Sequence, residues 1–497
     1  NKFKINKQFY KNMKSISRNS KNIIKIQKRQ FAGKAIDPNL KELDIAFIGS
    51  NHVASVLKYM QHTNFKGTMG AFNANPNSYN QHHYEYLIHG NIQPYKYLAN
   101  AFAGTYDTAA ALHISEKVVD INPAENKLTD SRGQEFTYKA LVLNTGCDQN
   151  PSNDEFLNKW VQDGVFGENR VFVHQNRNME NNERNRRIFS MHKDGDLIVY
   201  LPEYPSGREA YDAWYLGMDT YFSWGLQAET IPRGMKIRVI TPNNNLFRFP
   251  FANEVVMDEI QDRSLIETHF GWKITNVEVE QKGPQAVSRH ATFKNVETGE
   301  EMRLRFGTLL ATPSNKKREC FNSNDLTDEQ GQVTVNPYSL QHTKYPNVFA
   351  FGDCADVNTT KSFYATLNQG VVVRNNLTDY LAGNEFKAVY EGYSSFAVNH
   401  SFDRQWIFSH YYNNHPTFGN FYVPRFLGLF AYKLKCSFEK FYFGKIFGAK
   451  MNYAWPYIMK NKYFRPLNEN RYLINHGITR EQIMIHSGEA PILSFHK

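Results

Sequence analysis

The first residues with recognisable chemistry follow an apolar run at 43–49. The run predicts a buried parallel strand that ends at a glycine turn, and residues 51–62 predict the helix after it. Such a unit binds the phosphates of a dinucleotide, because the N–H groups that start the helix point toward the anion. The pattern here is Gly49-x-Asn51-x-x-Ala54. Gly49 supplies the tight turn and Ala54 is a common third residue, but Asn51 puts a side chain where a second glycine lets the backbone approach the phosphates.

Other candidate cofactor contacts stand at predicted strand ends, at Asn73, Thr145, Gly146, Gly352 and Asp353. Asn73 follows the second strand, where an acidic residue ordinarily holds the ribose hydroxyls. An asparagine there can still form hydrogen bonds, but it brings no charge. The adenosine end of the predicted site therefore differs from the usual pattern at two positions, Asn51 and Asn73.

The elements that position these residues alternate between strands and helices. Strands are predicted at 67–72, 112–121, 196–201, 236–240, 307–313 and 348–353, antiparallel strands at 273–306, a hairpin at 128–136, and a long helix at 361–381. Strands that alternate with helices in this way predict an α/β fold. Residues 148–195 are polar and predict a loop-rich excursion.

The order of these landmarks resembles the pyridine-nucleotide-disulfide oxidoreductase superfamily and, within it, the sulfide:quinone oxidoreductases, with the type II NADH dehydrogenases next. The matching segments are Gly49–Ala54, Leu141–Gly146, Tyr345–Asp356, Thr360–Ser362 and Asn368–Gly370, with local matches at Leu340–Phe349 and Tyr390–Tyr393. The resemblance spans residues 43–460. It implies two Rossmann-like dinucleotide-binding domains in the glutathione-reductase-like flavoprotein fold, followed by a C-terminal amphipathic helical region.

The resemblance also implies a division of the chain into domains. A basic arm occupies 1–42, a FAD-type domain 43–150 and 321–400, a degenerate NAD-type domain 151–320, and a C-terminal docking region 401–497.

FAD is the cofactor that the resemblance implies, with Asp353 on the ribityl chain and Lys361 and Gln369 near the flavin ring. In the alternative interpretation, Asp353 caps the helix that follows it by accepting backbone N–H bonds. Because Asn51 and Asn73 alter the adenosine end, the sequence leaves open whether FAD is bound. The strand at 196–201 leads into Pro202–Arg208 instead of a second glycine pattern, so we expect no NAD.

Sulfide oxidation needs two redox cysteines beside the flavin, because the sulfur is attacked and passed on as a thiolate species. By the resemblance, Arg208 stands at the first of these positions and Phe396 at the second, and neither side chain forms a persulfide. We therefore expect no catalytic residue. The four cysteines of the chain are Cys147, Cys320, Cys354 and Cys436. The resemblance makes Cys354 structural; Cys147 and Cys320 are interpreted as loop thiols without an acid–base partner, and their pairing at a flavin is the alternative.

Metal binding is not expected. No two cysteines form a C-x-x-C pair, and His82-His83 lack a third ligand.

Positive charge is concentrated at the N-terminal end. The chain has 58 Lys and Arg against 48 Asp and Glu, and residues 1–36 hold eleven of the bases and none of the acids. The rest of the chain is close to neutral, which argues against a nucleic-acid-binding body. The acid-free arm is typical of a mitochondrial targeting segment, with a solvated basic tail as the alternative. We expect the arm to lie on a partner protein.

Residues 418–463 show the pattern of an interfacial helix. Apolar side chains recur every three or four residues, with lysines off that stripe, at Phe426, Phe430, Leu434, Phe438 and Phe441. By the resemblance, such helices dock on the membrane surface, and the aromatic residues beside lysine suit that interface. A helix that covers the protein core or a partner subunit is the alternative.

These features predict a non-catalytic pseudoenzyme of the sulfide:quinone oxidoreductase type, which serves as an accessory subunit of a respiratory assembly. It would lie peripherally on the mitochondrial inner membrane, with other protein subunits and the membrane surface as partners. One alternative is an active FAD-dependent quinone oxidoreductase with an unidentified donor. Another is a soluble module that senses flavins or nucleotides.

Overall fold

The computed structural model describes residues 40–49, 52–62, 65–74, 77–79, 98–100, 111–150, 171–173, 195–201, 236–247, 250–261, 266–282, 287–311, 314–316, 318–329, 331–359, 361–401, 404–410, 412, 433 and 467–468. Several predicted features lie outside these residues: Asn51, Arg208, His82, His83, Cys436, the basic arm at 1–36, and all of 418–463 except Lys433. For Ala54 the structure describes the backbone alone.

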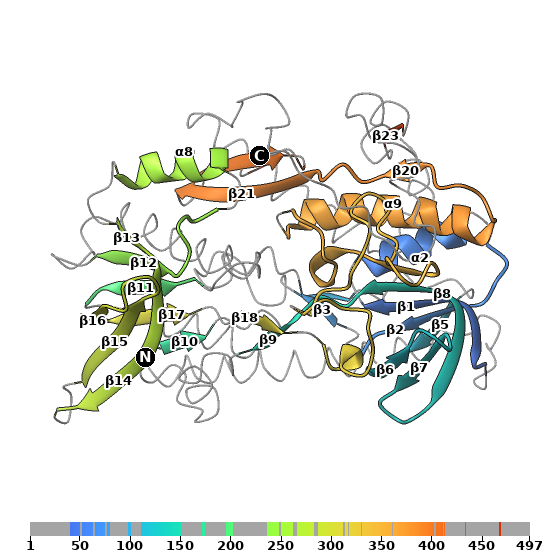
Figure 1. Ribbon diagram of the computed structural model, residues 1–497, viewed down its shortest axis with the longest axis horizontal. Coiled ribbons are helices and arrows are strands. Elements are labelled where there is room, and N and C mark those ends of the chain that lie inside the picture. Colours follow the sequence, from blue (N-terminus) through green and yellow to red (C-terminus); the bar gives the residue numbers. More distant parts are fainter. Residues whose placement is uncertain are drawn as a thin grey trace, which may run out of the picture.

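The first unit is built on a seven-stranded sheet, shown at the right of Figure 1. Its parallel strands are β5 (Ala111–Ile114), β2 (Met69–Phe72), β1 (Glu42–Gly49), β8 (Glu135–Asn144) and β19 (Val348–Ala350), in that order across the sheet. Along its other edge, β8 first runs antiparallel to β7 (Lys127–Asp130), which pairs with β6 (Val118–Asn122), and then parallel to β19. The predicted hairpin and the parallel strands around it are confirmed.

Two helices, α2 (Val53–His62) and α9 (Phe363–Leu381), pack against each other on one face of this sheet (Figure 1). Helix α2 buries Val53, Val56, Leu57 and Met60, whose spacing of three, one and three residues puts them on one helical face. Helix α9 begins after Ser362, whose hydroxyl accepts a hydrogen bond from the Ala365 N–H at 3.1 Å. Such an N-cap satisfies one of the backbone donors that the first turn of a helix leaves without a partner.

The second unit contains a five-stranded parallel sheet and a three-stranded antiparallel sheet. The parallel strands, in order, are β10 (Val171–Val173), β17 (Thr308–Ala311), β11 (Leu197–Tyr200), β12 (Ile237–Thr241) and β13 (Ile266–Phe270), and helix α8 (Pro250–Gln261) precedes β13. The antiparallel strands are β14 (Trp272–Gln281), β15 (Val287–Asn295) and β16 (Glu301–Arg305). Ile198, Ile240, Ile274 and Phe293 share one buried core between the two sheets.

Short elements connect the two units. β9 (Asp148–Asn150), which follows β8, pairs antiparallel with β18 (Ser314–Lys316), which follows β17. The hairpin of β21 (Ser394–Ser401) and β22 (Arg404–His410) runs from α9 toward α8 (Figure 1). The remaining pairs are β3 (Asn77–Tyr79) with β4 (Leu98–Asn100) and β20 (Ala388–Val389) with β23 (Leu467–Asn468). No helix among the described residues is both long and apolar enough to cross a membrane.

Candidate functional site

The predicted cofactor contacts meet where β1, β8 and β19 end. These strands are parallel neighbours, so their last residues lie at one edge of the sheet. The structure places Gly49 at the end of β1, Asn144 at the end of β8, and Gly352 two residues after β19. We call these three residues the strand-end corner.

Both glycines of the strand-end corner lie against Asn144. Gly49 has a φ of +130°, and a Cβ atom on it would lie 2.3 Å from the Asn144 carbonyl oxygen. Gly352 has a φ of +77°, and a Cβ atom there would lie 2.4 Å from Asn144 Nδ2. A positive φ of this kind is strained for any residue other than glycine. At both positions a side chain would also have to displace Asn144. The Asn144 amide donates a hydrogen bond to the Phe351 carbonyl oxygen at 2.7 Å, so it joins β8 to the turn after β19.

Gln369 holds the same turn from helix α9. Gln369 is buried, and its Oε1 accepts a hydrogen bond from the Gly352 N–H at 2.7 Å. Asp353 follows in the short 3-10 turn η4 (Gly352–Cys354), but the cap of α9 is Ser362. The alternative in which Asp353 caps the helix is therefore wrong. Two residues that the sequence did not single out, Asn144 and Ser362, organise this region.

Lys361 is buried beside η4. Its ammonium group donates hydrogen bonds to the carbonyl oxygens of Ala355 and Val357, the latter at 3.2 Å. Burial lowers the pKa of Lys361, while the nearby Asp353 carboxylate favours the charged form. Lys361 thus lies near Asp353, and Gln369 binds the neighbouring Gly352. Their role beside a flavin stays a prediction.

Thr145 and Gly146 continue from β8 into the loop beside Asp353. Gly146 has a φ of +65°, and its carbonyl oxygen accepts a hydrogen bond from Arg318 Nε at 3.4 Å. The next residue, Cys147, donates a hydrogen bond from Sγ to the Asp353 carbonyl oxygen at 3.1 Å. Cys147 therefore lies at the predicted cofactor site. The sequence favoured a loop thiol and left a pairing with Cys320 at a flavin as the alternative.

The adenosine end is described in part. Asn73 follows β2 at the same edge of the sheet, and its backbone N–H donates to the Ile114 carbonyl oxygen at 3.0 Å. Helix α2 starts close to Gly49, and the buried His52 opens it, since the His52 carbonyl oxygen accepts the N–H groups of Ser55 and Val56. Burial lowers the pKa of His113, on the neighbouring β5, to about 4. A phosphate group at this end would therefore meet backbone N–H groups rather than a described charged side chain.

Phe396, which the resemblance puts at the position of the second redox cysteine, packs against two other aromatic rings. Its ring is buried and parallel to that of Phe247, with centroids 5.8 Å apart and an interplanar angle of 21°. It also contacts Phe408 on the paired strand, at 5.5 Å between centroids. Among the described cysteines, Cys147, Cys320 and Cys354 carry buried thiols outside any disulfide, and burial raises the pKa of Cys354.

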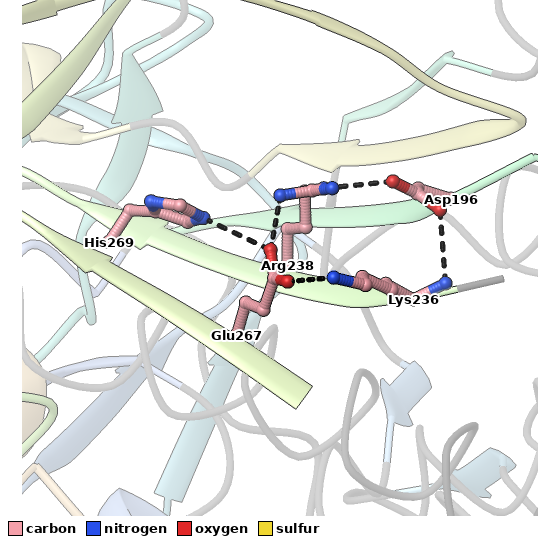
Figure 2. Close-up of polar contacts among 5 residues, drawn as sticks. All are labelled: Asp196, Lys236, Arg238, Glu267 and His269. Atoms are coloured by element: carbon pink, nitrogen blue, oxygen red, sulfur yellow. Dashed lines mark hydrogen bonds and ion pairs between the residues drawn. The ribbon is translucent and has the colours of Figure 1, made fainter. Parts of the chain in front are cut away.

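A charged cluster lies in the second unit, at the edge of the parallel sheet where β11, β12 and β13 begin (Figure 2). Arg238 Nε donates a hydrogen bond to Asp196 at 2.8 Å, and Arg238 Nη1 pairs with Glu267. Glu267 also binds Lys236, and its carboxylate lies 3.7 Å from His269 Nε2. The bond to Lys236 is the main cause of the lowered pKa of Glu267, and burial lowers that of His269. Two carboxylates and two permanent cations balance within the cluster, so we interpret it as a structural network.

The described residues fit a flavin dinucleotide at one end. An anionic ligand needs close approach to the backbone and positive charge. The glycines without room for a side chain allow the approach. The starts of α2 and α9, with the Lys361 ammonium beside α9, supply the positive charge. In the described part of the chain, no three His, Cys, Asp or Glu side chains are arranged to hold a metal ion.

Comparison with known proteins agrees with this fold. No protein-family model matches the chain. The mitochondrial sulfide:quinone oxidoreductase of Schizosaccharomyces pombe is 26% identical over 67% of this chain and 72% of its own length. That of Mus musculus is 22% identical over 57% of this chain and 59% of its own length, so the chain spans about three fifths of this relative.

Two solved structures share the fold over most of the chain. A chain in the structure of Tetrahymena thermophila mitochondrial ATP synthase matches with a TM-score of 0.68 at 22% identity, over 83% of this chain and 98% of that chain. The sulfide:quinone oxidoreductase of Aquifex aeolicus matches with a TM-score of 0.64 at 15% identity, over 88% of this chain and 96% of that one. The expected α/β fold of the Rossmann type and the resemblance to sulfide:quinone oxidoreductases are thereby confirmed.

Proposed function

We propose that this chain is a non-catalytic protein of the sulfide:quinone oxidoreductase type that serves as a structural subunit of a mitochondrial inner-membrane assembly. The observation on which the proposal rests is the stack formed by Phe396. A residue that must attack, hold and release sulfur needs a thiolate, and Phe396 offers a buried phenyl ring between Phe247 and Phe408.

The described thiols do not replace the missing one. A thiol reacts as the thiolate, and burial favours the neutral form. Cys354 is buried with a raised pKa, and Cys320 is buried beside Phe321 in the turn η3 (Glu319–Phe321). Cys147 binds a backbone carbonyl oxygen of the same turn that holds Gly352. The resemblance further implies that Arg208 replaces the other redox cysteine.

The proposed setting draws on the comparison with the ATP synthase of Tetrahymena thermophila, where the similar chain is matched over 98% of its length. We propose an assembly of that kind, the mitochondrial ATP synthase, as the host complex. The acid-free basic arm at 1–36 and the amphipathic pattern at 418–463 are the segments we propose for contacts with neighbouring subunits and the membrane surface.

The proposal holds with or without FAD, which would be a bound group without turnover. Gly49 and the start of α2 would receive the diphosphate, and Gly352, Asp353 and Lys361 would surround the flavin end. FAD, when bound, supplies two-electron redox chemistry. The chain's own residues supply tight backbone contact and a buried cation.

The test is purification of the protein from its native membranes under mild detergent. The proposal predicts that it migrates with a large inner-membrane complex and shows no sulfide-dependent reduction of a quinone analogue. Migration as a separate species that reduces quinone with sulfide would contradict both parts of the proposal.

The second candidate is an active FAD-dependent quinone oxidoreductase with another donor. The grouping of Lys361, Asp353 and Gln369 around Gly352 favours it, because these residues match those near the flavin in the resemblance. A visible flavin spectrum at one equivalent per chain that bleaches with a donor and returns with quinone would establish this function instead.

A further inference from the structure

The hairpin β21–β22 contacts both units of the protein through different sets of aromatic residues. Its base belongs to the core of the first unit, which includes Tyr338, Tyr390 and Tyr412. The Tyr412 ring meets the other two edge to face, at 5.8 Å from Tyr338 and 5.7 Å from Tyr390. The Tyr412 hydroxyl donates to the Pro337 carbonyl oxygen at 2.6 Å. These contacts fix the residue that follows β22 to the first unit.

Two further contacts restrain the start of β21. Gly392 has a φ of +82°, and a Cβ atom on it would lie 2.3 Å from Tyr412 Cγ, so the two ends of the hairpin touch at this glycine. The buried Ser394 lies 3.1 Å, hydroxyl to hydroxyl, from Ser362, the cap of α9. The hairpin therefore leaves the first unit from a fixed point beside the candidate site.

The other contact of the hairpin is with the second unit. Phe396 on β21 pairs across the hairpin with Phe408 on β22, and its ring stacks on Phe247. Phe247 lies between β12 and α8, and the side chain of Asn253 in α8 accepts its N–H at 3.4 Å and that of Leu246 at 2.9 Å. All three phenyl rings are buried. Figure 1 shows β21 running from beside the start of α9 toward α8.

We propose that the hairpin β21–β22 locks the two units in one relative position and that Phe396 is the residue that makes this lock. A cysteine, which the resemblance expects there, has no ring to stack on Phe247. The change from thiol to phenyl ring would then add a structural contact as well as remove a reactive group. This inference rests on the contacts of Phe396 and does not depend on the proposed function.

Amide hydrogen exchange of the full chain, read by mass spectrometry, tests the proposal through Phe396→Ala. Loss of the stack should speed exchange by about tenfold both in the hairpin and in residues 242–261, which are distant in sequence, because an aromatic pair of this kind contributes about one such factor. Phe136→Ala is the matched control. Phe136 is equally buried and packs edge to face on Phe72, 5.0 Å away, inside the first unit. It should leave exchange at 242–261 unchanged.

Phe247→Ala should give the same increase at 242–261 as Phe396→Ala, and the two changes together should add little there, since both remove the contact between these two rings. Phe396→Leu keeps apolar volume without the stack and serves as the readout if the alanine variant fails to fold. Unchanged exchange at 242–261 in the Phe396 variants, or an equal increase there in Phe136→Ala, would overturn the proposal.

Discussion

Gly352→Ala measures how tightly the strand-end corner is packed. At a φ of +77° a residue with a Cβ atom is less stable than glycine by about 1–2 kcal/mol. The added Cβ atom would also lie 2.4 Å from Asn144 Nδ2 and 3.0 Å from Thr366 Cγ2. Such overpacking costs about 1–3 kcal/mol more. We expect Gly352→Ala to lower the free energy of unfolding by about 2–5 kcal/mol from these two contributions.

Gly133→Ala is the matched control for the backbone effect. Gly133 has a φ of +76°, almost the same as Gly352, but a Cβ atom there would have no neighbour within 4 Å. The control should therefore show the conformational cost alone, about 1–2 kcal/mol. Urea-induced unfolding, followed by circular dichroism, compares the two variants with the parent protein through their midpoints.

Asn144→Ala makes the comparison sharper, since it removes the amide that the new Cβ atom would meet. In the Gly352→Ala background this change should cost less than it does alone. Equal losses of stability in Gly352→Ala and Gly133→Ala, together with simple additivity of Gly352→Ala and Asn144→Ala, would refute the close approach seen at this corner.

Three further predictions concern histidine, the charged cluster and FAD. Burial lowers the pKa of His342 from 6.5 to about 4, so the unfolded chain takes up the proton first and stability falls as the pH drops through 6.5. Thermal unfolding should show about 2 kcal/mol less stability at pH 5 than at neutral pH from this residue, and His342→Gln should reduce this dependence of stability on pH. Glu267→Gln should lower the urea midpoint more than Glu278→Gln, because Glu267 binds both Lys236 and Arg238 whereas Glu278 pairs with the exposed Arg303. Because the pKa of Glu267 is lowered in the folded protein, this difference should disappear as the pH falls below 4.5. Equal midpoints at pH 7 would contradict the prediction. Asn51→Gly should raise the fraction of chains that carry FAD, read from the visible spectrum, whereas the exposed-loop control Asn244→Gly should not; no change in either would dismiss Asn51 as the obstacle.

The parts of the fold that the sequence predicted are those set by local pattern. Apolar runs that end in glycine predicted β1, β8 and β19, because a buried parallel strand is apolar throughout and its exit turn needs a positive φ. The helices after Gly49 and Lys361 followed from the same logic. The grouping of Lys361 and Gln369 around Gly352 came from the resemblance, not from any pattern in these residues.

Contacts between distant residues were not predictable in this way. Asn144 touches Phe351, 207 residues further on, and nothing in its own neighbourhood marks it as the residue that fixes two glycines. The resemblance puts Phe396 at a cysteine position, but its contact with Phe247 depends on how the hairpin crosses to the second unit. Asp353 was given a capping role as an alternative because it precedes a helix, whereas Ser362 is closer to the start of α9 and takes it.

The packing of the strand-end corner weakens its two glycines as evidence for bound FAD. Gly49 and Gly352 would ordinarily count as evidence for a dinucleotide, yet both are required by Asn144 of the protein itself. The Lys361 ammonium likewise donates hydrogen bonds to two carbonyl groups of the chain itself. A protein that kept this fold without the cofactor would keep these residues for the same reasons.

Asn73, at the end of β2, is a position where the sequence differs from the usual dinucleotide-binding pattern. The described bond at Asn73 is made by its backbone N–H, which any residue other than proline provides, so this bond does not dictate the side chain. An acidic residue at the end of β2 serves the ribose of a bound dinucleotide, and here an uncharged one takes its place. An uncharged residue at this position, beside glycines that the fold itself needs, agrees with the proposed non-catalytic role.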